Sequence, residues 1–475
     1  AGGNVVRFRN STLSQAGGTY YQVYFCASSP TNRLRFSEGS AVSVTDARVF
    51  EGTDAKGNEM SFVGSSFTNK SSLVVADAAG ADGNVLSFDG SVYHSSSQWN
   101  AFEFASKGSS NALVFANSAV EDPRWLRVGR DAGATGNEVR FVGQGCSWSI
   151  PACDQKCFGA GTGNRFVFDD CTLDNYSAYL YFYLSDTDRS NDSATGYENA
   201  STNNTVCNYA CCSNTVAVDS GSTLAAMDIW IRGVGNAVVV SNGTVRVTQS
   251  GKGLVFGSEG DVPAGQPYVE GGNRLVLKGT SPKIANYGSS DYGAQAKFFD
   301  GSEIVIEVPE TGYEADHVVF DGIGAKITYP SKLRFTGVEE YSKTLKKNVD
   351  IRLSNCRFDI LDVPEGTDFW AEVNVGMPSG CYAYLDASGC LCLHVKRGRQ
   401  SGLLIVVRGA EEHLPRAAQP ITTHLMTETR IVEKLALKDE KKAFDAIWLG
   451  DSITQGYGPL RSSQTYVSVA NRLLN

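Results

Sequence analysis

Gly83-Asn84-Val85-Leu86-Ser87-Phe88 is one of seven segments with the same layout in the N-terminal part of the chain. In each segment an apolar residue follows the asparagine by two positions, and phenylalanine follows it by four. Side chains two residues apart point to the same face of a β-strand, so each segment predicts a strand with one apolar face. The asparagines are Asn4, Asn32, Asn58, Asn84, Asn111, Asn137 and Asn164, and the phenylalanines are Phe8, Phe36, Phe62, Phe88, Phe115, Phe141 and Phe168.

The spacing of these segments predicts a solenoid. Successive asparagines are 26 to 28 residues apart, and a second strand is predicted late in the unit, as at Leu73-Val74-Val75 and Leu126-Arg127-Val128. A fixed period in the mid-twenties with β-type patterning is typical of stacked repeats. One unit alone cannot bury its phenylalanine, so the units must stack and place these rings in a continuous interior ladder.

We therefore predict a mainly β fold, a right-handed parallel β-helix over residues 1–360. Crossovers between parallel strands are right-handed in nearly all proteins. A propeller blade needs about 40 residues, and a β-sandwich gives no reason for phenylalanine at one fixed offset. The period loosens after residue 170, with a polar stretch at 185–204, and strands resume at Gly235-Asn236 and Gly272-Asn273.

The repeat pattern resembles right-handed β-helix proteins of bacterial surfaces, such as autotransporter-type passengers and carbohydrate-active β-helices. The resemblance covers about residues 1–360 and implies display or binding at a cell surface. Beyond it we predict a β-rich cap over 361–410, with strands at 369–373 and 403–407. A charged linker over 411–426 and an α/β segment over 427–475 follow.

The C-terminal segment contains a motif that carries chemistry. Phe444-Asp445-Ala446-Ile447-Trp448-Leu449 is an apolar strand run that breaks into Gly450-Asp451-Ser452, and helices are predicted near 427–437 and over 465–474. This order of elements opens an α/β layer. The alternative is a simple turn, in which Asp451 and Ser452 bond only to the local backbone.

Residues 444–458 resemble the first conserved block of the SGNH/GDSL hydrolases, a family of esterases, lipases and carbohydrate deacetylases. The resemblance implies that Ser452 is the nucleophile of acyl transfer, in the block formed with Gly450 and Asp451. It also implies that the Ser452 backbone N–H is one oxyanion donor. In the family the base is a histidine in a later Asp-x-x-His block, whereas only 23 residues follow Ser452 here and none is histidine. We therefore expect a processed or truncated chain that is inactive by itself, with its base encoded beyond Asn475.

Composition excludes several function classes. The net charge is −9 without a long run of one sign, so a nucleic-acid footprint is absent. No stretch approaches the roughly 18 apolar residues of a transmembrane helix. No cofactor or metal motif is predicted. The twelve cysteines fit buried thiols or disulfides, and a zinc site less well because no pair of CxxC motifs occurs.

Two groups of residues within the solenoid are candidates for a second site. Carboxylates near residue 170 and in the polar stretch suit calcium or a glycosidic acid/base pair, although solvated loop carboxylates are commoner. Alternating tyrosines suit stacking on sugar rings or packing in the coil. The residues are Asp169, Asp170, Asp174, Asp186 and Asp188, and Tyr179, Tyr181 and Tyr183.

Two functions remain open from the sequence. The first is a secreted or cell-surface SGNH-type esterase that deacylates carbohydrate, with the β-helix binding or displaying a polysaccharide partner. The second is a non-enzymatic, adhesin-like or structural β-helix protein.

Overall fold

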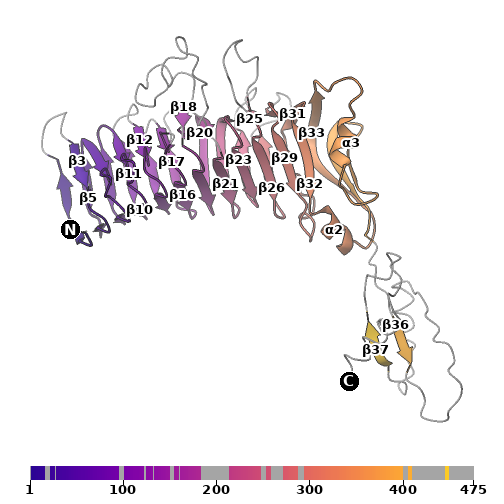
Figure 1. The fold of residues 1–475 in the computed structure, drawn as a ribbon, viewed down its shortest axis with the longest axis horizontal. Helices are drawn as coiled ribbons and strands as arrows, with labels where there is room; N and C mark the ends of the chain where they lie inside the picture. Colours follow the sequence, from indigo (N-terminus) through magenta and orange to yellow (C-terminus); the bar gives the residue numbers. More distant parts are fainter. Residues whose placement is uncertain are drawn as a thin grey trace. The chain divides into compact units, whose positions relative to one another are not determined.

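The computed structural model describes most of the N-terminal four fifths of the chain and two short C-terminal segments. The described residues are 2–15, 22–26, 28–95, 101–121, 125–131, 133–149, 154–159, 161–182, 213–247, 253–257, 271–286, 294–398, 405–408 and 444–448. The chain divides into two compact units, residues 1–397 and 398–475. The first unit is a solenoid of parallel strands stacked in long sheets (Figure 1). The mainly β, parallel-solenoid fold class is confirmed, and the handedness of the coil stays a prediction.

One side of the coil is a sheet of twelve parallel strands, called here the long sheet. Its first seven strands are the seven segments that the sequence predicts. In order the strands are β1 (Val5–Arg9), β4 (Arg33–Ser37), β7 (Glu59–Val63), β10 (Val85–Asp89), β13 (Ala112–Ala116), β16 (Glu138–Val142), β19 (Arg165–Asp169), β21 (Thr215–Asp219), β23 (Ala237–Ser241), β26 (Arg274–Lys278), β29 (Glu303–Glu307) and β32 (Lys332–Thr336).

Two shorter sheets complete a three-sided coil in the first half. The six-stranded sheet contains β2 (Thr12–Ser14), β5 (Ala41–Val44), β8 (Ser66–Asn69), β11 (Val92–Ser95), β14 (Ala119–Glu121) and β17 (Ser147–Ser149). The five-stranded sheet contains β3 (Gln22–Phe25), β6 (Asp46–Val49), β9 (Leu73–Val75), β12 (Ala101–Phe104) and β15 (Trp125–Val128). The predicted second strand of the unit is thus confirmed as β9 and β15. The strands of the six-stranded sheet were not predicted.

In the second half these two sides merge into one sheet. β20 (Thr172–Phe182) and β22 (Thr223–Ile231) are long enough to cover both, and β22 pairs with β24 over its first half and β25 over its second. The other strands on the main path of this sheet are β18 (Asp154–Lys156), β24 (Thr244–Val247), β25 (Gly253–Phe256), β27 (Lys283–Asn286), β28 (Gln295–Phe298), β30 (Phe320–Asp321), β31 (Gly324–Thr328) and β33 (Val349–Leu361).

The interior ladder of phenylalanines is confirmed. Each of the seven rings stacks on the next, with centroids 4.9 to 5.5 Å apart and ring planes within 21° of parallel. From Phe36 to Phe168 the rings are almost completely buried. The same position continues in register as Val218, Val240, Leu277 and Ile306, so aliphatic side chains replace the rings in the second half.

A ladder of ten asparagines runs along the corner where the long sheet begins. The backbone N–H of each of the first nine donates to Oδ1 of the asparagine in the next rung, at 2.7 to 3.2 Å. Beyond the seven predicted positions the ladder includes Asn214, Asn236 and Asn273. From Asn58 onward these residues are at most 1% exposed, so the ladder satisfies backbone donors that water cannot reach.

The residue before each asparagine adopts a left-handed backbone conformation. Most of these positions hold glycine, but Thr31, Ser110 and Ser213 have φ of 58°, 56° and 56°. A residue with a Cβ pays a conformational penalty there that glycine avoids.

Ser110→Gly is therefore expected to raise the free energy of unfolding by about 0.5–1 kcal/mol. The matched reverse change is Gly83→Ser, at φ of 66° with nothing within 4 Å of the added Cβ, which should destabilise by a similar amount. Urea unfolding of both variants measures the pair. A stabilising Gly83→Ser would contradict this account of the corner.

The C-terminal end of the first unit is covered. After β32 come α2 (Val338–Thr344), β33, α3 (Phe369–Asn374), β34 (Tyr382–Leu385) and β35 (Cys390–Val395). Val338, Phe369 and Val373 join the buried core, and β35 pairs antiparallel with both β33 and β34.

The strand predicted at 369–373 is wrong, because this segment forms α3. Asp368 caps the helix by accepting hydrogen bonds from the backbone N–H groups of Trp370 and Ala371, at 3.0 and 3.1 Å. An aspartate N-cap supplies an acceptor to the first turn and favours the helix over a strand of the same apolar content. The segment Cys390-Leu391-Cys392 forms the first half of β35.

The second unit is described only at two strands. β36 (Ile405–Arg408) and β37 (Phe444–Trp448) pair antiparallel. β36 lies in the range predicted for the cap but belongs to the second unit. The helices predicted near 427–437 and over 465–474 lie outside the described residues.

Candidate functional site

The predicted nucleophile block follows β37. The strand predicted before the Gly-Asp-Ser turn is confirmed over 444–448, and it ends two residues before Gly450. Gly450, Asp451 and Ser452 lie outside the described residues, so their roles stay predictions. What is established is the local order of elements, a strand followed closely by the motif.

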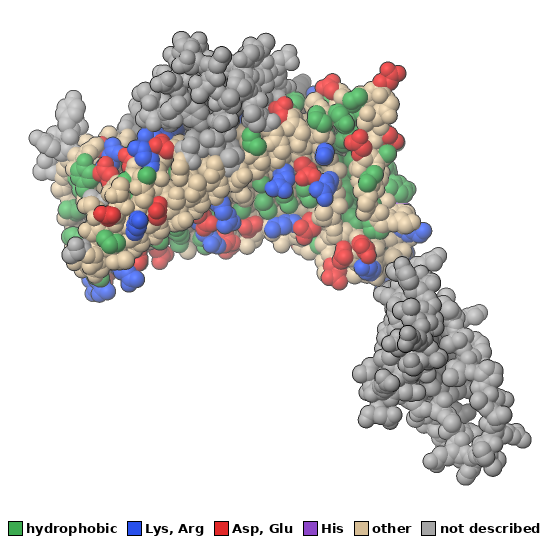
Figure 2. Space-filling view, in the orientation of Figure 1, with side chains coloured by type: hydrophobic (Ala, Val, Ile, Leu, Met, Phe, Trp, Pro, Cys, Tyr) green, Lys and Arg blue, Asp and Glu red, His purple; other side chains and the backbone are tan. Residues whose placement is uncertain are grey.

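The first unit brings two carboxylates together on the outward face of the long sheet. Asp169 at the end of β19 lies in register with Asp219 at the end of β21. Arg140 of the preceding rung donates to Asp169, and Gln144 donates to Asp170 at 2.7 Å. Figure 2 shows basic and acidic side chains lying next to each other along the visible face of this unit.

Only part of the predicted acidic group belongs to this site. Asp170 lies at the exposed corner after β19, with φ of 51°, and accepts its hydrogen bond from Gln144. The side chain of Asp174 lies outside the described residues, as do Asp186, Asp188 and the side chains of the three tyrosines. No group of three or more His, Cys, Asp or Glu side chains within the described ranges is placed to hold a metal ion.

Sequence reasoning missed Asp219, although a signal exists. Asp169 follows Asn164 by five residues, and Asp219 follows Asn214 by five. The polar insertion places these two asparagines 50 residues apart, so the period of 26 to 28 residues did not predict a rung at Asn214. Once that rung is recognised, the shared offset places the two aspartates side by side.

The surroundings push the pKa values of the two carboxyls in opposite directions. The hydrogen bond from Arg140 lowers the pKa of Asp169. Burial raises the pKa of Asp219, and the charge of Asp169 raises it further, while Lys278 opposes both. Two nearby carboxyls with divergent pKa values are the arrangement that general acid/base chemistry uses. Both carboxyls are partly exposed on the outward face of the sheet, so the pair is suited first to binding polar groups.

Asp219→Asn is expected to stabilise the protein at pH 7, by less than about 1 kcal/mol at this partly exposed site. A carboxyl whose pKa is raised by folding loses stability as pH rises through that pKa, so the gain should vanish in acid. Asp169→Asn is the control with the opposite sign. The lowered pKa of Asp169 contributes stability above the unfolded-state pKa, which is lost as pH falls through the folded pKa. Thermal unfolding between pH 3 and 7 measures both, and equal signs would contradict the assignment.

The cysteines that the structure describes are free thiols. Cys26, Cys146, Cys157, Cys171, Cys356, Cys381, Cys390 and Cys392 form no disulfide. Cys146 and Cys171 occupy the corner that serine holds in neighbouring rungs, and Cys146 Sγ contacts the Phe115 carbonyl oxygen at 3.3 Å. Burial raises the pKa of the Cys171 thiol to about 11, which disfavours the reactive thiolate.

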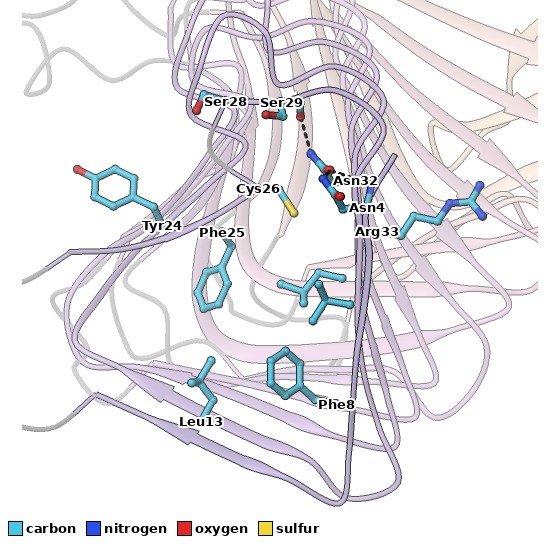
Figure 3. A pocket seen from close by; sticks show the side chains of 12 residues that line it. Asn4, Phe8, Leu13, Tyr24, Phe25, Cys26, Ser28, Ser29, Asn32 and Arg33 are labelled. Atoms are coloured by element: carbon cyan, nitrogen blue, oxygen red, sulfur yellow. Dashed lines mark hydrogen bonds between the residues drawn. The ribbon is translucent and has the colours of Figure 1, made fainter. Parts of the chain in front are cut away.

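The open N-terminal end of the coil holds a hollow of about 450 Å³. Figure 3 shows Phe8, Leu13 and Phe25 pointing into the space between the three sheets, while Tyr24 and Arg33 point away from it. It is lined by residues of the first rung and of the start of the second.

No protein-family model, curated protein or solved structure matches the chain. Among the described residues, no helix has both the length and the apolar character that crossing a membrane requires.

Proposed function

We propose that this chain is the solenoid and the nucleophile-bearing part of a secreted or cell-surface SGNH-type esterase that removes acyl groups from a carbohydrate. The observation that carries the proposal is strand β37, which ends two residues before Gly450-Asp451-Ser452. A serine at the tip of a strand presents its hydroxyl to a substrate, and its own N–H helps to bind the oxyanion.

The proposed chemistry is acyl transfer in two steps. Ser452 Oγ attacks the ester carbonyl carbon while a histidine takes the hydroxyl proton, and the carbohydrate hydroxyl leaves with that proton as the acyl-enzyme forms. Water, deprotonated by the same histidine, then attacks the acyl-enzyme and releases the free acid and the serine. No histidine follows Ser452 in this sequence, so the proposal requires an Asp-x-x-His block outside residues 1–475.

The proposed role of the solenoid is to bind and display a linear polysaccharide. Its long sheet presents outward side chains in columns that step by one strand spacing, about 4.8 Å per rung. The Asp169–Asp219 pair, flanked by Arg140 and Lys278, offers both hydrogen-bond acceptors and donors to sugar hydroxyl groups. A repeating surface of this kind suits a repeating ligand.

Esterase assays with p-nitrophenyl acetate and an acetylated polysaccharide test the enzymatic proposal. A gene product that extends past Asn475 and contains the histidine block should hydrolyse both. Ser452→Ala should lower kcat at least about 1,000-fold, because an acyl-transfer nucleophile is lost. Ser462→Ala is the matched control and should leave kcat unchanged. Residues 1–475 alone should show no hydrolysis.

Two results would overturn the proposal. One is an extended gene without an Asp-x-x-His block. The other is hydrolysis by residues 1–475 that is lost on Ser452→Ala, since the base would then come from another part of this chain.

The adhesin-like alternative is favoured by one observation: the described ranges are dominated by the solenoid and contain no complete catalytic set. A glycan array probed with the Ser452→Ala chain discriminates the two. Glycan binding together with the absence of esterase activity in the extended gene product would select the non-enzymatic function.

A further inference from the structure

An apolar stripe runs along the outward face of the long sheet. The middle outward position holds only valine or alanine on five consecutive strands, β19 to β29, and these positions are in register. In the first four strands of the same sheet this position holds arginine or serine. The stripe consists of Val167, Ala217, Val239, Val276 and Val305, and the last three are only partly buried.

An arginine closes each end of the stripe. Arg140 on β16 and Arg334 on β32 hold the same position directly before and directly after it. Each arginine already has an acidic partner, since Arg140 donates to Asp169, and Arg334 donates to Glu303 at 3.2 Å. Neighbouring strands lie about 4.8 Å apart, so the stripe is roughly 19 Å long.

The outward positions on the two sides of the stripe carry charges in a complementary order about the central strand, β23. Counting away from β23, β21 is matched with β26, β19 with β29, and β16 with β32. At three of the matched positions the charges are opposite. These pairs are Arg165 and Glu303, Glu138 and Lys332, and Asp219 and Lys278.

A two-fold axis that runs parallel to the strands and passes over β23 converts this order into contacts between two copies. The stripe of one copy then lies on the stripe of the other, and each strand faces its matched strand in the second copy. Each of the three opposite pairs forms twice. Sheets that pack face to face lie about 10 Å apart with nearly aligned strands, so long charged side chains can meet beside an apolar centre.

Two matched positions carry like charges. Arg140 faces Arg334 of the second copy, and Asp169 faces Glu307 of the second copy. These four side chains gather at each end of the stripe, where each arginine lies diagonally across from a carboxylate of the other copy. Two positive and two negative charges meet there, so each end is neutral.

The other aligned orientation fits less well. With the two-fold axis along the stack of strands, each strand faces its own counterpart and the two sides of the stripe exchange. Arg274 would then face Lys278, and Glu303 would face Glu307. Arg165 and Asp169 alone would form an opposite pair. Charge complementarity therefore selects the axis parallel to the strands.

We propose that the outward face of β16 to β32 is a homodimer interface with its two-fold axis at β23. A second copy of this chain covers the apolar stripe and forms the three ion pairs twice. The seven strands cover roughly 500 Å² of sheet per copy. That is near the lower limit for a specific interface, so the dissociation constant is expected in the micromolar range.

This inference does not rest on the proposed esterase activity. The dimer covers the Asp169–Asp219 pair, so a polysaccharide bound to that pair and the second copy exclude each other.

Sedimentation equilibrium of the full 475-residue chain tests the proposal, at concentrations between about 1 and 100 µM. The unchanged chain should show a monomer–dimer equilibrium. Val239→Lys places two ammonium groups against each other at the axis and should raise the dissociation constant at least about tenfold. Val92→Lys is the matched control, at a partly buried outward valine of β11, and should leave the dissociation constant unchanged.

A charge exchange tests the orientation of the two copies. Asp219→Lys and Lys278→Asp each place like charges across the interface, so each variant alone should have a dissociation constant at least about tenfold higher. Mixed in equal amounts, the two variants should form heterodimers, because opposite charges then meet at every contact between positions 219 and 278. The double variant Asp219→Lys/Lys278→Asp should regain the dissociation constant of the unchanged chain. Circular dichroism checks that each variant is folded.

Three outcomes would overturn the proposal. They are a chain that stays monomeric over the whole concentration range, a dimer that Val239→Lys leaves intact, and single-charge variants that do not associate when mixed. The esterase assays are separate measurements, and their failure leaves these expectations unchanged.

Discussion

Replacing Asn111 with alanine is expected to lower the free energy of unfolding by about 3 kcal/mol. The Asn111 side chain donates to the Ala81 carbonyl oxygen and to Asn137 Oδ1, at 3.0 and 3.1 Å. Its Oδ1 accepts from the backbone N–H and the side chain of Asn84, at 2.9 and 3.0 Å. The substitution removes all four bonds and leaves the buried Asn84 N–H without its acceptor, which is the costly part of the loss.

Asn4→Ala is the matched control for the asparagine ladder. Asn4 belongs to the same ladder but is exposed at its end, so water replaces the lost contacts and the cost should stay below about 1 kcal/mol. Urea unfolding followed by circular dichroism measures both variants. Equal losses at the two positions would show that burial of the ladder is not the source of its contribution.

Phe115→Ala is expected to cost about 3–5 kcal/mol, the range for a fully buried phenylalanine. Phe115 has no exposed surface and lies between Phe88 and Phe141, with centroid distances of 5.1 Å to each. The cavity cannot close from above or below, because the neighbouring rungs are held at the strand spacing by their own hydrogen bonds.

Two further variants separate the parts of this effect. Phe115→Leu keeps most of the volume but loses ring stacking on both sides, so about 1–3 kcal/mol is expected. Phe8→Ala at the open end, where the ring is only partly buried, should cost less than Phe115→Ala. A loss for Phe8→Ala as large as that for Phe115→Ala would contradict the dependence on position along the ladder.

The fold was predictable where one residue type recurs at one offset. Asparagine and phenylalanine four residues apart predict the strand, its inward face and the stacking, and the structure confirms all three. Asn214 was not predicted, because an insertion lengthens the distance in sequence from Asn164 to Asn214. Asp219, which lies in register with Asp169, was missed for the same reason. Spacing arguments fail at insertions even where the underlying register is intact.

Other features depend on contacts that no local pattern signals. Glu103 and Arg127 stand at positions that alternate with inward phenylalanine and leucine, yet they are 6% and 4% exposed. Arg127 donates to both carboxylate oxygens of Glu103, at 2.9 and 2.7 Å. Segment 369–373 has an apolar content that suits a strand, but the N-cap hydrogen bond to the Asp368 side chain favours a helix. The Ser452 block stays a prediction, since only the strand before it is described.

Because every rung has the same corner, the length of the first unit along the stack of strands follows from the number of rungs. Adjacent strands lie about 4.8 Å apart, so the twelve strands of the long sheet extend over roughly 50 Å. Segments 75–84 and 128–137, two rungs apart, are identical at six of ten positions, so different rungs build this corner from a similar sequence. Gain or loss of a rung changes the distance between the ends of the unit in steps of about 4.8 Å. That distance is therefore set by the number of rungs, and the outward side chains are free to change without altering it.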